Sequence, residues 1–328
     1  MGLPLVLGCG FLAALPCVVL LVLRLYIRGH PVAPIKNRLD GRVIIITGGS
    51  SGIGRAAALE CARRGAKVIL ACRDAAKAEA VVLSIRRKTS NEEVHFRQLD
   101  LASLVSVREF VGQFTKQFGR VHTIVNNAGN SVSPLKNHMD GHDMCFQVNY
   151  LGHFLLTSLL IKHANPGKSA ANLLRVVNLT SDAYKNNKLD FNDLMDRKPG
   201  RYGMYETYGR SKLAMVLFTT ELNYIYADKG VYAVAVHPGA VSTGLLRNWP
   251  GIFGSILRLA AQILFRSPEV GALSIVQCTA VHNPEDYCGK LVFDCAAQEV
   301  EEIGKDYRSA ERLWYISRDI CRLEEETE

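Results

Sequence analysis

One short stretch restricts the fold of this chain more than any other. The β-branched run Val43–Ile46 leads directly into the glycine-rich turn Thr47–Gly54, and a segment of helical character follows, from about Ser51 to Arg64. Glycines let the backbone turn sharply and approach a ligand, and the helix N-terminus behind them offers N–H groups to a phosphate. This order predicts a dinucleotide site rather than an ordinary tight turn. Its residues would be Thr47, Gly48, Ser50, Ser51, Gly52, Ile53 and Gly54.

Apolar strand segments and helical segments alternate along the rest of the chain. Helices are expected at 75–88 and 105–117, and further strands at 67–72, 94–99, 123–126, 175–179, 232–236 and 291–293. That alternation is typical of a parallel sheet covered by helices on both faces. The sequence therefore predicts a Rossmann-type, doubly wound α/β sheet of about seven strands. Because the composition does not change within 41–300, we expect one domain there, followed by a C-terminal helical tail at 301–328.

The chain begins with an apolar segment. Leu3–Leu23 contains no charged residue, and a helix of that length, at about 1.5 Å per residue, spans roughly the 30 Å core of a bilayer. A cleaved signal peptide needs Lys or Arg before its apolar run. Here the basic residues come after it, at Arg24, Arg28, Lys36, Arg38 and Arg42. By the positive-inside rule we expect an uncleaved transmembrane anchor at 1–28, a linker at 29–40 and a body in the cytosol. The endoplasmic reticulum is the default membrane, with a mitochondrial membrane or a lipid droplet as alternatives.

Composition excludes several classes of protein. With 48% apolar and 21% charged residues, the chain can bury a core and is not disordered. Its nine cysteines are odd in number, scattered and without a C-x-x-C pair, so we expect neither a disulfide scaffold nor a metal site. The flank of the anchor and the phosphate site account for the net charge of +8, and we expect no nucleic-acid binding. Gly54 is followed by Arg55 and not by the lysine of an ATP-binding phosphate loop.

The end of the second strand bears on which dinucleotide would bind. NAD-binding proteins place Asp or Glu there to hold the ribose 2′-hydroxyl. Here Cys72 occupies the strand tip and Arg73 follows, and a guanidinium suits a 2′-phosphate. We therefore expect NADP(H) in preference to NAD(H). Asp74 leaves NAD(H) open as the alternative, because a strand that ended one residue away would change which side chain stands at its tip and so reverse the preference for NADP(H).

A tyrosine and a lysine, Tyr208 and Lys212, are four residues apart in a segment expected to be helical, so both lie on one face. A nearby ammonium favours the phenolate and lowers the pKa of a tyrosine from about 10. That makes the tyrosine a usable general acid near neutral pH. The same spacing occurs at Tyr184 and Lys188, but the residues between them are polar and turn-like. We expect catalysis from the first pair and not from the second.

Residues 40–300 resemble a classical short-chain dehydrogenase/reductase. The matching pieces occur in the order of that family: Thr47–Gly54, Asp100-Leu101, Asn126–Gly129, Asn149, Ser181, Tyr208 with Lys212, and His237–Gly239 with Val241 and Thr243. The resemblance implies an oxidoreductase that moves hydride between a nicotinamide cofactor and an alcohol or carbonyl group.

The resemblance also implies a role for each matching residue. Tyr208 would exchange a proton with the substrate oxygen, Ser181 would hydrogen-bond that oxygen, and Lys212 would lower the pKa of Tyr208 and hold the nicotinamide ribose. Asn149 would hold a water that relays protons through Lys212. Cofactor contacts would come from Asp100, Leu101, Asn127, Ala128, Gly129, Pro238, Gly239, Val241 and Thr243. Two alternatives stay open: Thr180 could replace Ser181 if the strand is shifted by one residue, and Asn149 could be structural. We expect His153 and His237 to be structural.

Three segments resemble one branch of the family, the retinol dehydrogenase-like enzymes: Asn149–Leu156, Ala71–Asp74 and Leu189–Leu194. Many members of that branch are membrane-bound, face the cytosol and prefer NADP(H). We therefore expect interconversion of a lipophilic alcohol and its aldehyde or ketone, with retinol and retinal first and sterols, prenols or fatty aldehydes as alternatives. A catalytically silent, cofactor-binding regulatory protein is the alternative from another class. The family often forms homodimers, which this sequence leaves open.

Substrate specificity would reside in two stretches around this site, 182–207 and 244–270. Within the second, the apolar run 249–265 has Arg258 and Arg266 at its edges. It would either lie in a membrane interface or pack over the site as a lid, and the sequence favours neither.

Overall fold

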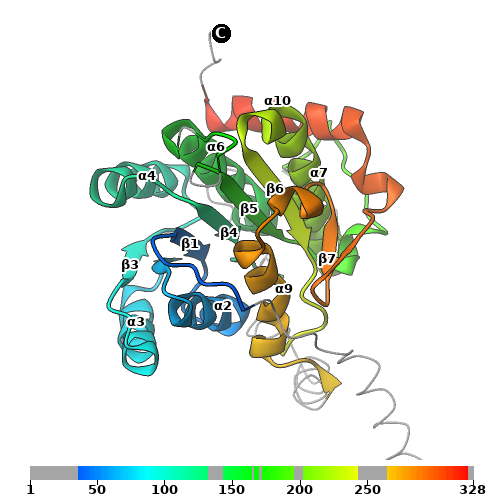
Figure 1. Ribbon diagram of the computed structural model, residues 1–328. Helices are drawn as coiled ribbons and strands as arrows, with labels where there is room; N and C mark the ends of the chain where they lie inside the picture. The colour runs from blue at the N-terminus through cyan, green and yellow to red at the C-terminus, as the bar shows by residue number, and fades with distance from the viewer. Residues whose placement is uncertain are drawn as a thin grey trace, which may run out of the picture.

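The computed structural model describes residues 36–131, 143–164, 166–169, 172–195, 202–242 and 264–323. Its centre is one eight-stranded sheet in the order β3-β2-β1-β4-β5-β6-β7-β8 (Figure 1). All neighbouring strands are parallel except β7 and β8, which are antiparallel. The strands are β1 (Val43–Thr47), β2 (Lys67–Cys72), β3 (Val94–Gln98), β4 (Thr123–Asn126), β5 (Leu174–Leu179), β6 (Val231–Val236), β7 (Leu291–Phe293) and β8 (Ala296–Gln298).

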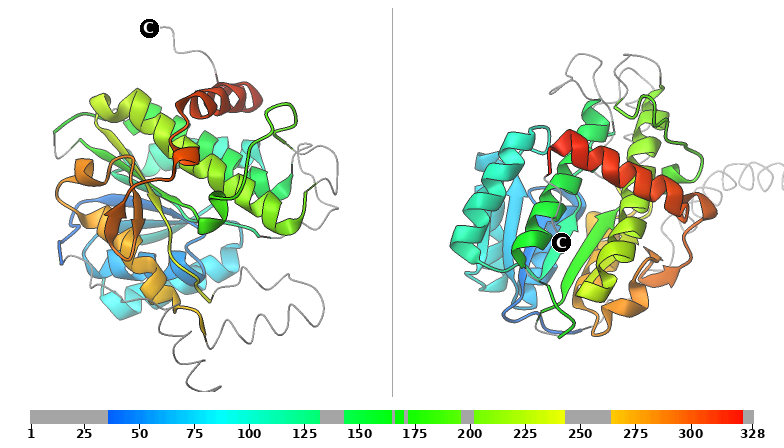
Figure 2. Two further views of the ribbon diagram at one scale, coloured as in Figure 1. Left: turned by 90° about the vertical axis from the view of Figure 1, so that its right-hand side faces the viewer. Right: turned by 90° about the horizontal axis from the view of Figure 1, so that it is seen from above.

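Helices cover both faces of the sheet (Figure 2). On one face lie α2 (Gly52–Arg63), α3 (Ala75–Thr89) and α9 (Pro268–Ala280). On the other lie α4 (Leu104–Phe118), α6 (Gly152–Ala164), α7 (Met204–Tyr226) and α10 (Tyr307–Cys321). Before α6 come the short helix α5 (Met144–Phe146) and a π-helical turn, Gln147–Leu151. Side chains alternate between the two faces of the sheet along a strand, so successive residues belong to the cores on opposite faces. Ile45 packs with α6, and Ile44 and Ile46 pack with α2.

The predicted architecture is confirmed. Each expected strand is present within one residue of its expected bounds, and so are the expected helices. The sequence does not predict β8, because its three residues are exposed and carry no apolar alternation. This strand forms because the chain reverses at Asp294 and Cys295, which have φ values of 50° and 62°, and then pairs with the edge strand β7.

The strand order reverses at β1, and this reversal places the ligand-facing turns. β1 pairs with β2 on one side and with β4 on the other, so the connections leave its carboxyl end and that of β4 in opposite directions. Open α/β sheets bind ligands in the crevice at such a point. Thr47–Gly54, Asn127–Gly129, Ser181 and Pro238 follow β1, β4, β5 and β6, respectively. The predicted site residues therefore meet along one edge of the sheet.

The C-terminal helix α10 belongs to the main core. Leu313 and Trp314 are buried together with residues of α6 and α7. The rings of Trp314 and Phe154 lie edge to face with centroids 5.1 Å apart, and the Tyr150 hydroxyl lies 2.7 Å from Ser317 Oγ. The tail expected at 301–328 thus contributes apolar surface to the domain that precedes it.

Among the described residues, one helical stretch, Met144–Ala164, is long and apolar enough to cross a membrane. It is 78% buried inside the molecule, where α6 packs against the sheet and α4, so it is a core element. The anchor expected at 1–28 and most of the linker expected at 29–40 lie outside the described residues.

Candidate active site

Helix α7 and the end of β5 bring Tyr208 and Ser181 together. The Ser181 hydroxyl is close enough to the Tyr208 phenol to favour its ionisation, and Ser181 Oγ accepts from the Ala183 N–H at 3.3 Å. The neighbouring Thr180 is buried, and its hydroxyl donates to the Lys212 carbonyl at 3.1 Å. Thr180 is therefore used inside the core, and Ser181 lies next to Tyr208. This arrangement favours Ser181 over the alternative of a one-residue shift, and its catalytic role stays a prediction.

Lys212 lies one helical turn after Tyr208, with Nζ 5.5 Å from the centroid of the tyrosine ring. It is 4% exposed and donates to the Leu179 carbonyl at 3.0 Å. Burial lowers the pKa of this ammonium to about 8.

The pKa of Tyr208 is raised above its usual value. Burial is the main cause, the nearby Cys145 thiol adds to it, and the hydrogen bond from Ser181 opposes it. The expected lowering of this pKa is not found in this structure, because the loss of hydration on burial outweighs the other influences on the phenol. Tyr208 is consequently a protonated donor at neutral pH, which is the form needed to protonate a substrate oxygen.

Asn149 stands in the π-helical turn, a wide turn that is frequent at functional sites. Its Oδ1 accepts from the Asn130 N–H at 2.7 Å, and its Nδ2 donates to the Asn130 carbonyl and to Ser211 Oγ, both at 2.9 Å. A Cβ on Gly129 would lie 3.5 Å from Asn149 Oδ1 and 3.8 Å from Lys212 Nζ. The structure therefore brings Asn149, Lys212 and the turn after β4 together. The amide of Asn149 holds that turn, and its proton relay stays a prediction.

Hydrogen bonds to Thr47 join the turn after β1 to the turn after β4. The N–H groups of Asn127 and Ala128 both donate to Thr47 Oγ1 at 2.9 Å, and Asn127 Nδ2 donates to the Thr47 carbonyl at 2.7 Å. Gly54 packs against the same amide, since a Cβ on it would lie 2.4 Å from Asn127 Nδ2 and 2.7 Å from the Gly48 carbonyl oxygen. The two turns are thus held as one unit.

His153 links this unit to Asn149. The imidazole is fully buried, with Nε2 2.9 Å from Thr47 Oγ1 and Nδ1 2.9 Å from the Asn149 carbonyl oxygen. Burial lowers its pKa to about 3, so the ring is neutral and has one N–H. Because a carbonyl can only accept, Nδ1 carries that proton, and Nε2 accepts from the Thr47 hydroxyl. His153 is structural, as expected, but its link from the glycine turn to Asn149 has no signal in the sequence.

The N-terminus of α2 suits an anionic group. Ser51 precedes it without a side-chain capping hydrogen bond, and no acidic residue stands in the first turn. Gly48 and Gly52 have φ values of 66° and 52°, which glycine adopts without strain. The residues present therefore fit the pyrophosphate of a dinucleotide. By contrast, side chains cap α3, α4, α9 and α10, namely Asp74, Ser103, Ser267 and Asp306.

The end of β2 lies next to this turn. The strand ends at Cys72, which is buried; burial raises the pKa of its thiol, and the nearby Ser50 opposes this. Asp74 is the N-cap of α3 and accepts from the Lys77 N–H at 3.0 Å. Asp74 is thus committed to its own helix, and Arg73 is exposed between the two.

The remaining predicted cofactor residues lie along the same edge. Asp100 follows β3, and its Oδ1 accepts from the Ala102 N–H at 3.0 Å. The side chain of Leu101 is buried against Gly152 in the core, so a cofactor contact from Leu101 would come from its backbone and stays a prediction. Thr243 lies outside the described residues. Partly exposed positions after β6 are Pro238, Gly239 and Val241.

Two side-chain pairs hold the loops at this edge of the sheet in place. The sequence predicts neither pair. His237 Nε2 lies 3.0 Å from Asp182 Oδ2, which ties the residue after Ser181 to the residue before Pro238. The hydrogen bond from His237 lowers the pKa of Asp182 far below its usual range. His237 is therefore structural, as expected.

The second pair is Arg266 with Asp294, in which Arg266 Nη2 donates to Oδ2 at 3.0 Å. Arg266 is 3% exposed, and its backbone bonds to Ala240 and Ser242 at 2.8 and 2.9 Å. Arg266 is therefore held inside the domain. The rest of the run expected at 249–265 lies almost entirely outside the described residues.

Comparison with known proteins places this arrangement in a family. The pattern of the short chain dehydrogenases matches residues 42–192. Over 293 residues the chain is 38% identical to retinol dehydrogenase 12 of Mus musculus, which covers 89% of this chain and 90% of that protein. The chain belongs to the short-chain dehydrogenase family.

Two further relatives agree with this membership. The chain is 38% identical over 308 residues to retinol dehydrogenase 13 of Homo sapiens, which covers 92% of this chain and 91% of that protein. A crystal structure of a short chain dehydrogenase from Burkholderia cenocepacia J2315 in complex with NADP superposes with a TM-score of 0.61 at 25% identity, covering 78% of this chain and 97% of that one.

As a short-chain dehydrogenase, the protein is an NAD(P)-dependent oxidoreductase that acts on CH–OH groups. A nicotinamide cofactor, when bound, supplies or accepts the hydride. The glycine turn and the N-terminus of α2 would hold its pyrophosphate. During reduction, negative charge develops on the substrate oxygen, and the hydroxyl groups of Tyr208 and Ser181 would stabilise it. The proton would come from Tyr208, and these two roles stay predictions.

Proposed function

We propose that this protein is an NADP(H)-dependent oxidoreductase that interconverts a lipophilic alcohol and its aldehyde or ketone, with retinol and retinal as the first pair. The observation that carries the proposal is the Tyr208–Ser181 pair one helical turn from Lys212, in a chain that matches two retinol dehydrogenases over about nine-tenths of its length. The pair supports the reaction, and the relatives support the substrate class.

The preference for NADP(H) is supported by the end of β2. Cys72 occupies the position where an acid would hold a ribose 2′-hydroxyl, and Asp74 is committed to capping α3. The exposed Arg73 remains as the charge beside the glycine turn. A 2′-phosphate would bind it as a charge-assisted partner.

Attachment to a membrane is supported by the uncharged stretch Leu3–Leu23 and by the basic residues that follow it. We propose an anchor in the endoplasmic reticulum with the catalytic domain in the cytosol. An anchored enzyme would take a lipophilic substrate directly from the bilayer. Resistance of the full chain to carbonate extraction tests the anchor, and release into the supernatant would contradict it.

The reaction is tested with membranes that contain the wild-type chain, Tyr208→Phe or Tyr224→Phe, supplied with retinal and NADPH. Tyr208→Phe should lose at least about 100-fold in kcat, because positioned acids contribute about 10²–10⁴-fold, and should keep its affinity for NADPH. Tyr224 is the matched control, since it is 77% exposed on the same helix, and its variant should turn over normally. Equal kcat values for wild type and Tyr208→Phe would contradict the proposal.

The same assay identifies the substrate. A steroid ketone, a long-chain aldehyde and a prenal are compared with retinal, and the highest kcat/KM names the class. Tight binding of NADPH without turnover of any of the four would favour the regulatory alternative.

Cofactor preference is tested with Arg73→Ala. Loss of a charge-assisted hydrogen bond is worth about 1.5–3 kcal/mol, so the KM for NADPH should rise roughly tenfold or more while the KM for NADH stays the same. Arg87→Ala, an exposed arginine of α3, should change neither. Equal changes for both cofactors would contradict the assignment.

A further inference from the structure

The ends of β6 and β7 place two aromatic rings side by side. The two strands are parallel neighbours (Figure 1), with Val236 opposite Val292, and the His237 N–H donates to the Val292 carbonyl at 3.0 Å. The residues that follow this pair, His237 and Phe293, therefore stand at matching positions. Their rings are stacked, with centroids 5.1 Å apart and planes 18° from parallel. The stack ties the loop after β6 to the end of β7.

Arg266 contacts the same phenyl ring. Its guanidinium carbon lies 4.7 Å from the Phe293 centroid, a distance at which a cation and an aromatic ring attract each other. The same side chain passes close to Gly239, where a Cβ would lie 2.8 Å from Arg266 Nε. Gly239 also has a φ of 79°, which glycine adopts without strain. Glycine at this position therefore lets the loop after β6 lie against Arg266.

Asp182 extends these contacts to the turn after β5. Its Oδ2 accepts from His237 Nε2 at 3.0 Å, and its Oδ1 accepts from Lys185 Nζ at 2.9 Å. Asp182 is also the first residue of the 3₁₀ turn Asp182–Tyr184, for which Ser181 is the N-cap. The hydrogen bond from His237 therefore acts on the residue that is covalently next to Ser181.

Four side chains thus form one continuous series of contacts, which we call the side-chain row: Asp182, His237, Phe293 and Arg266. It joins the turn of Ser181, the loop after β6 and the end of the stretch 243–265. The loop after β6 contains residues predicted to contact the cofactor. Hydride transfer needs substrate and cofactor in one fixed geometry, so the distance between Ser181 and this loop matters for the reaction.

We propose that His237 is a positioning residue for hydride transfer, and that it holds Ser181 at a fixed distance from the cofactor loop. It does so through Asp182 on one side and Phe293 on the other. The proposal rests on the proposed function, in which Ser181 hydrogen-bonds the substrate oxygen. His237 acts through its neighbours and is not itself a catalytic residue. Its imidazole makes two contacts, a hydrogen bond and a ring stack, and a substitution can keep one of them.

Two substitutions separate these contacts. His237→Phe keeps a ring to stack on Phe293 but loses the donor to Asp182, whereas His237→Gln loses the ring and keeps an N–H donor of similar reach. With NADPH and the best aldehyde of the panel, His237→Phe should lower kcat by about 10- to 100-fold, because a small displacement of Ser181 weakens its bond to the reacting oxygen. Its KM for NADPH should stay within about threefold, since Phe293 and Arg266 still hold the loop. His237→Gln should recover most of the loss in kcat.

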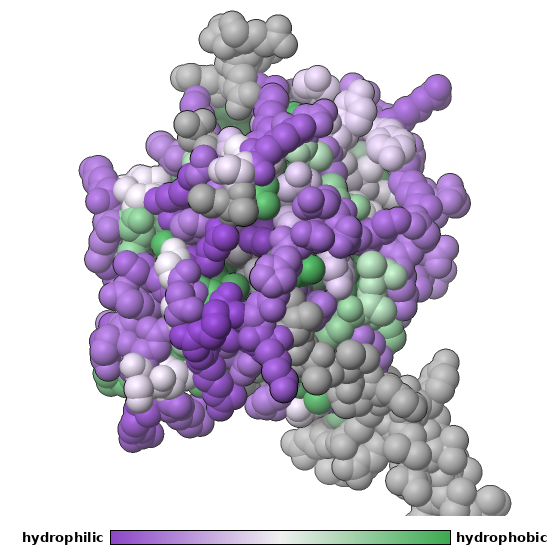
Figure 3. Space-filling view, viewed as in Figure 1, coloured by the Kyte–Doolittle hydropathy of each residue, from purple (hydrophilic) through white to green (hydrophobic). Residues whose placement is uncertain are grey.

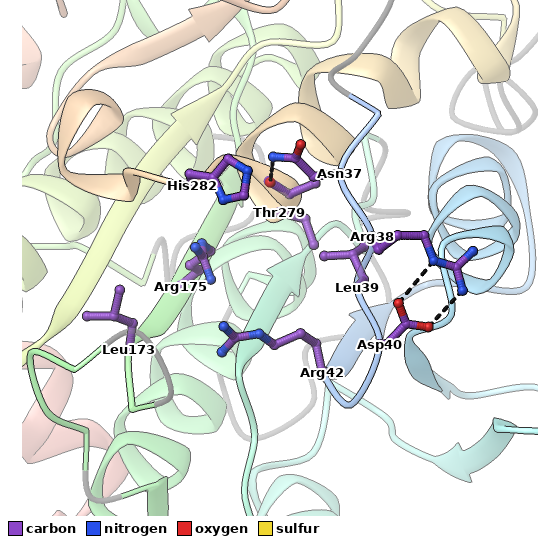
Figure 4. A pocket seen from close by; sticks show the side chains of 10 residues that line it. Asn37, Arg38, Leu39, Asp40, Arg42, Leu173, Arg175, Thr279 and His282 are labelled. Atoms are coloured by element: carbon purple, nitrogen blue, oxygen red, sulfur yellow. Dashed lines mark hydrogen bonds and ion pairs between the residues drawn. The ribbon is translucent and has the colours of Figure 1, made fainter.

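His282→Phe is the matched control. It makes the same substitution at an exposed histidine. The molecular face that carries the linker before β1 and helix α9 is largely hydrophilic (Figure 3), so one more ring there should leave the packing intact. His282 lines a cavity between that linker and the end of α9, together with Arg175 at the start of β5 (Figure 4). The start of β5 is at the opposite edge of the sheet from Ser181, so kcat and both KM values should equal those of the wild type.

Asp182→Ala covers the case of a His237 variant that fails to fold. It should lower kcat about as much as His237→Phe does. The double variant should lose about as much as the more impaired single variant, because both substitutions break the same hydrogen bond. Losses that multiply in the double variant would overturn the proposal. So would kcat values within about threefold of the wild type for both single variants.

Hydrogen exchange of the full chain with NADPH, without substrate, tests the side-chain row independently of turnover. The N–H groups of residues 183–185 bond back to Ser181 and Asp182, and their exchange reports how firmly this turn is held. Exchange should become at least about tenfold faster in His237→Phe and should not change in His282→Phe. Equal exchange in His237→Phe and the wild type would overturn the proposal. Faster exchange in a protein whose wild type turns over none of the aldehydes would contradict only the proposed function.

Discussion

Lys212 shows at the scale of one residue how the active site trades stability for chemistry. Its ammonium is buried beside Tyr208, with a pKa lowered to about 8 from 10.5. Burial thus works against the charge that the family mechanism uses to hold the nicotinamide ribose.

Removing that charge should change how stability depends on pH. Below pH 8 both the folded and the unfolded chain hold the lysine proton. Between pH 8 and 10.5 the unfolded chain binds a proton that the folded chain has released, so the free energy of unfolding rises with pH. From pH 7 to 9.5 this contribution is about 2 kcal/mol. Lys212→Met should lack it in urea titrations, whereas Lys88→Met, at an exposed lysine, should keep it. Parallel profiles for the wild type and Lys212→Met would contradict the burial effect.

His153 and Thr47 form the other prediction at this scale. Thr47→Val and His153→Leu should each lower the free energy of unfolding by about 1–3 kcal/mol, because each leaves buried polar groups unpaired. The double variant should lose less than the sum, by about 0.5–3 kcal/mol, because both single variants break the same hydrogen bond. Denaturant titrations of all four proteins measure this coupling. Thr115→Val is the control, because the Thr115 hydroxyl bonds within α4, and its effect on the free energy of unfolding should add to that of His153→Leu. Additive effects of Thr47→Val and His153→Leu would contradict the hydrogen bond between these two side chains.

At the scale of an element, the glycine turn is a packing interface as well as a ligand cradle. Gly54, in the first turn of α2, touches the Asn127 amide that holds the turn after β4. Gly112, in the middle of α4, has nothing within 4 Å of the position of a Cβ. We therefore expect opposite effects on stability from replacing these two glycines with alanine, although both lie in helices.

Gly54→Ala should weaken cofactor binding and lower the Tm, because the methyl group would push the Asn127 side chain or the Gly48 carbonyl aside. Gly112→Ala should raise stability by about 0.5–1 kcal/mol, the difference in helix propensity. Cofactor titration and thermal unfolding of both variants give the comparison. A Gly54→Ala protein that binds NADPH like the wild type would show that the turn adapts.

Elements with a strong pattern could be predicted from the sequence, and those without one could not. The run Val43–Ile46 and the later apolar runs of the central strands predict strands from their composition alone. β8 has three exposed residues and exists only because β7 offers an edge. The π-helical turn that carries Asn149 has no pattern of its own, since its extra residue is accommodated by packing against the turn after β4.

At the scale of the whole molecule, the motif residues could be brought together from sequence because each follows a parallel strand of one sheet. Ser181 and Thr47 are far apart in the chain, yet both lie at the carboxyl ends of strands that finish at the same edge of the sheet. The pairs His237–Asp182 and Arg266–Asp294 could not be predicted, because they depend on how separate loops pack. The direction of the Tyr208 pKa was missed for the same reason, since burial is a property of the folded protein and not of a four-residue spacing.

The backbone bonds of Arg266 to Ala240 and Ser242 have a consequence for how such a protein can change over generations. Ala240 and Ser242 precede the stretch 243–265 and Arg266 follows it, so these bonds hold its two ends together, and a change in the length of a connection between joined ends costs little free energy. A chimera that carries this stretch from a relative should keep its KM for NADPH and change its order of preferred aldehydes. If both change together, the stretch is coupled to the cofactor site. If only the order of preferred aldehydes changes, mutations in this stretch can alter the substrate without altering the residues that bind the cofactor and transfer hydride.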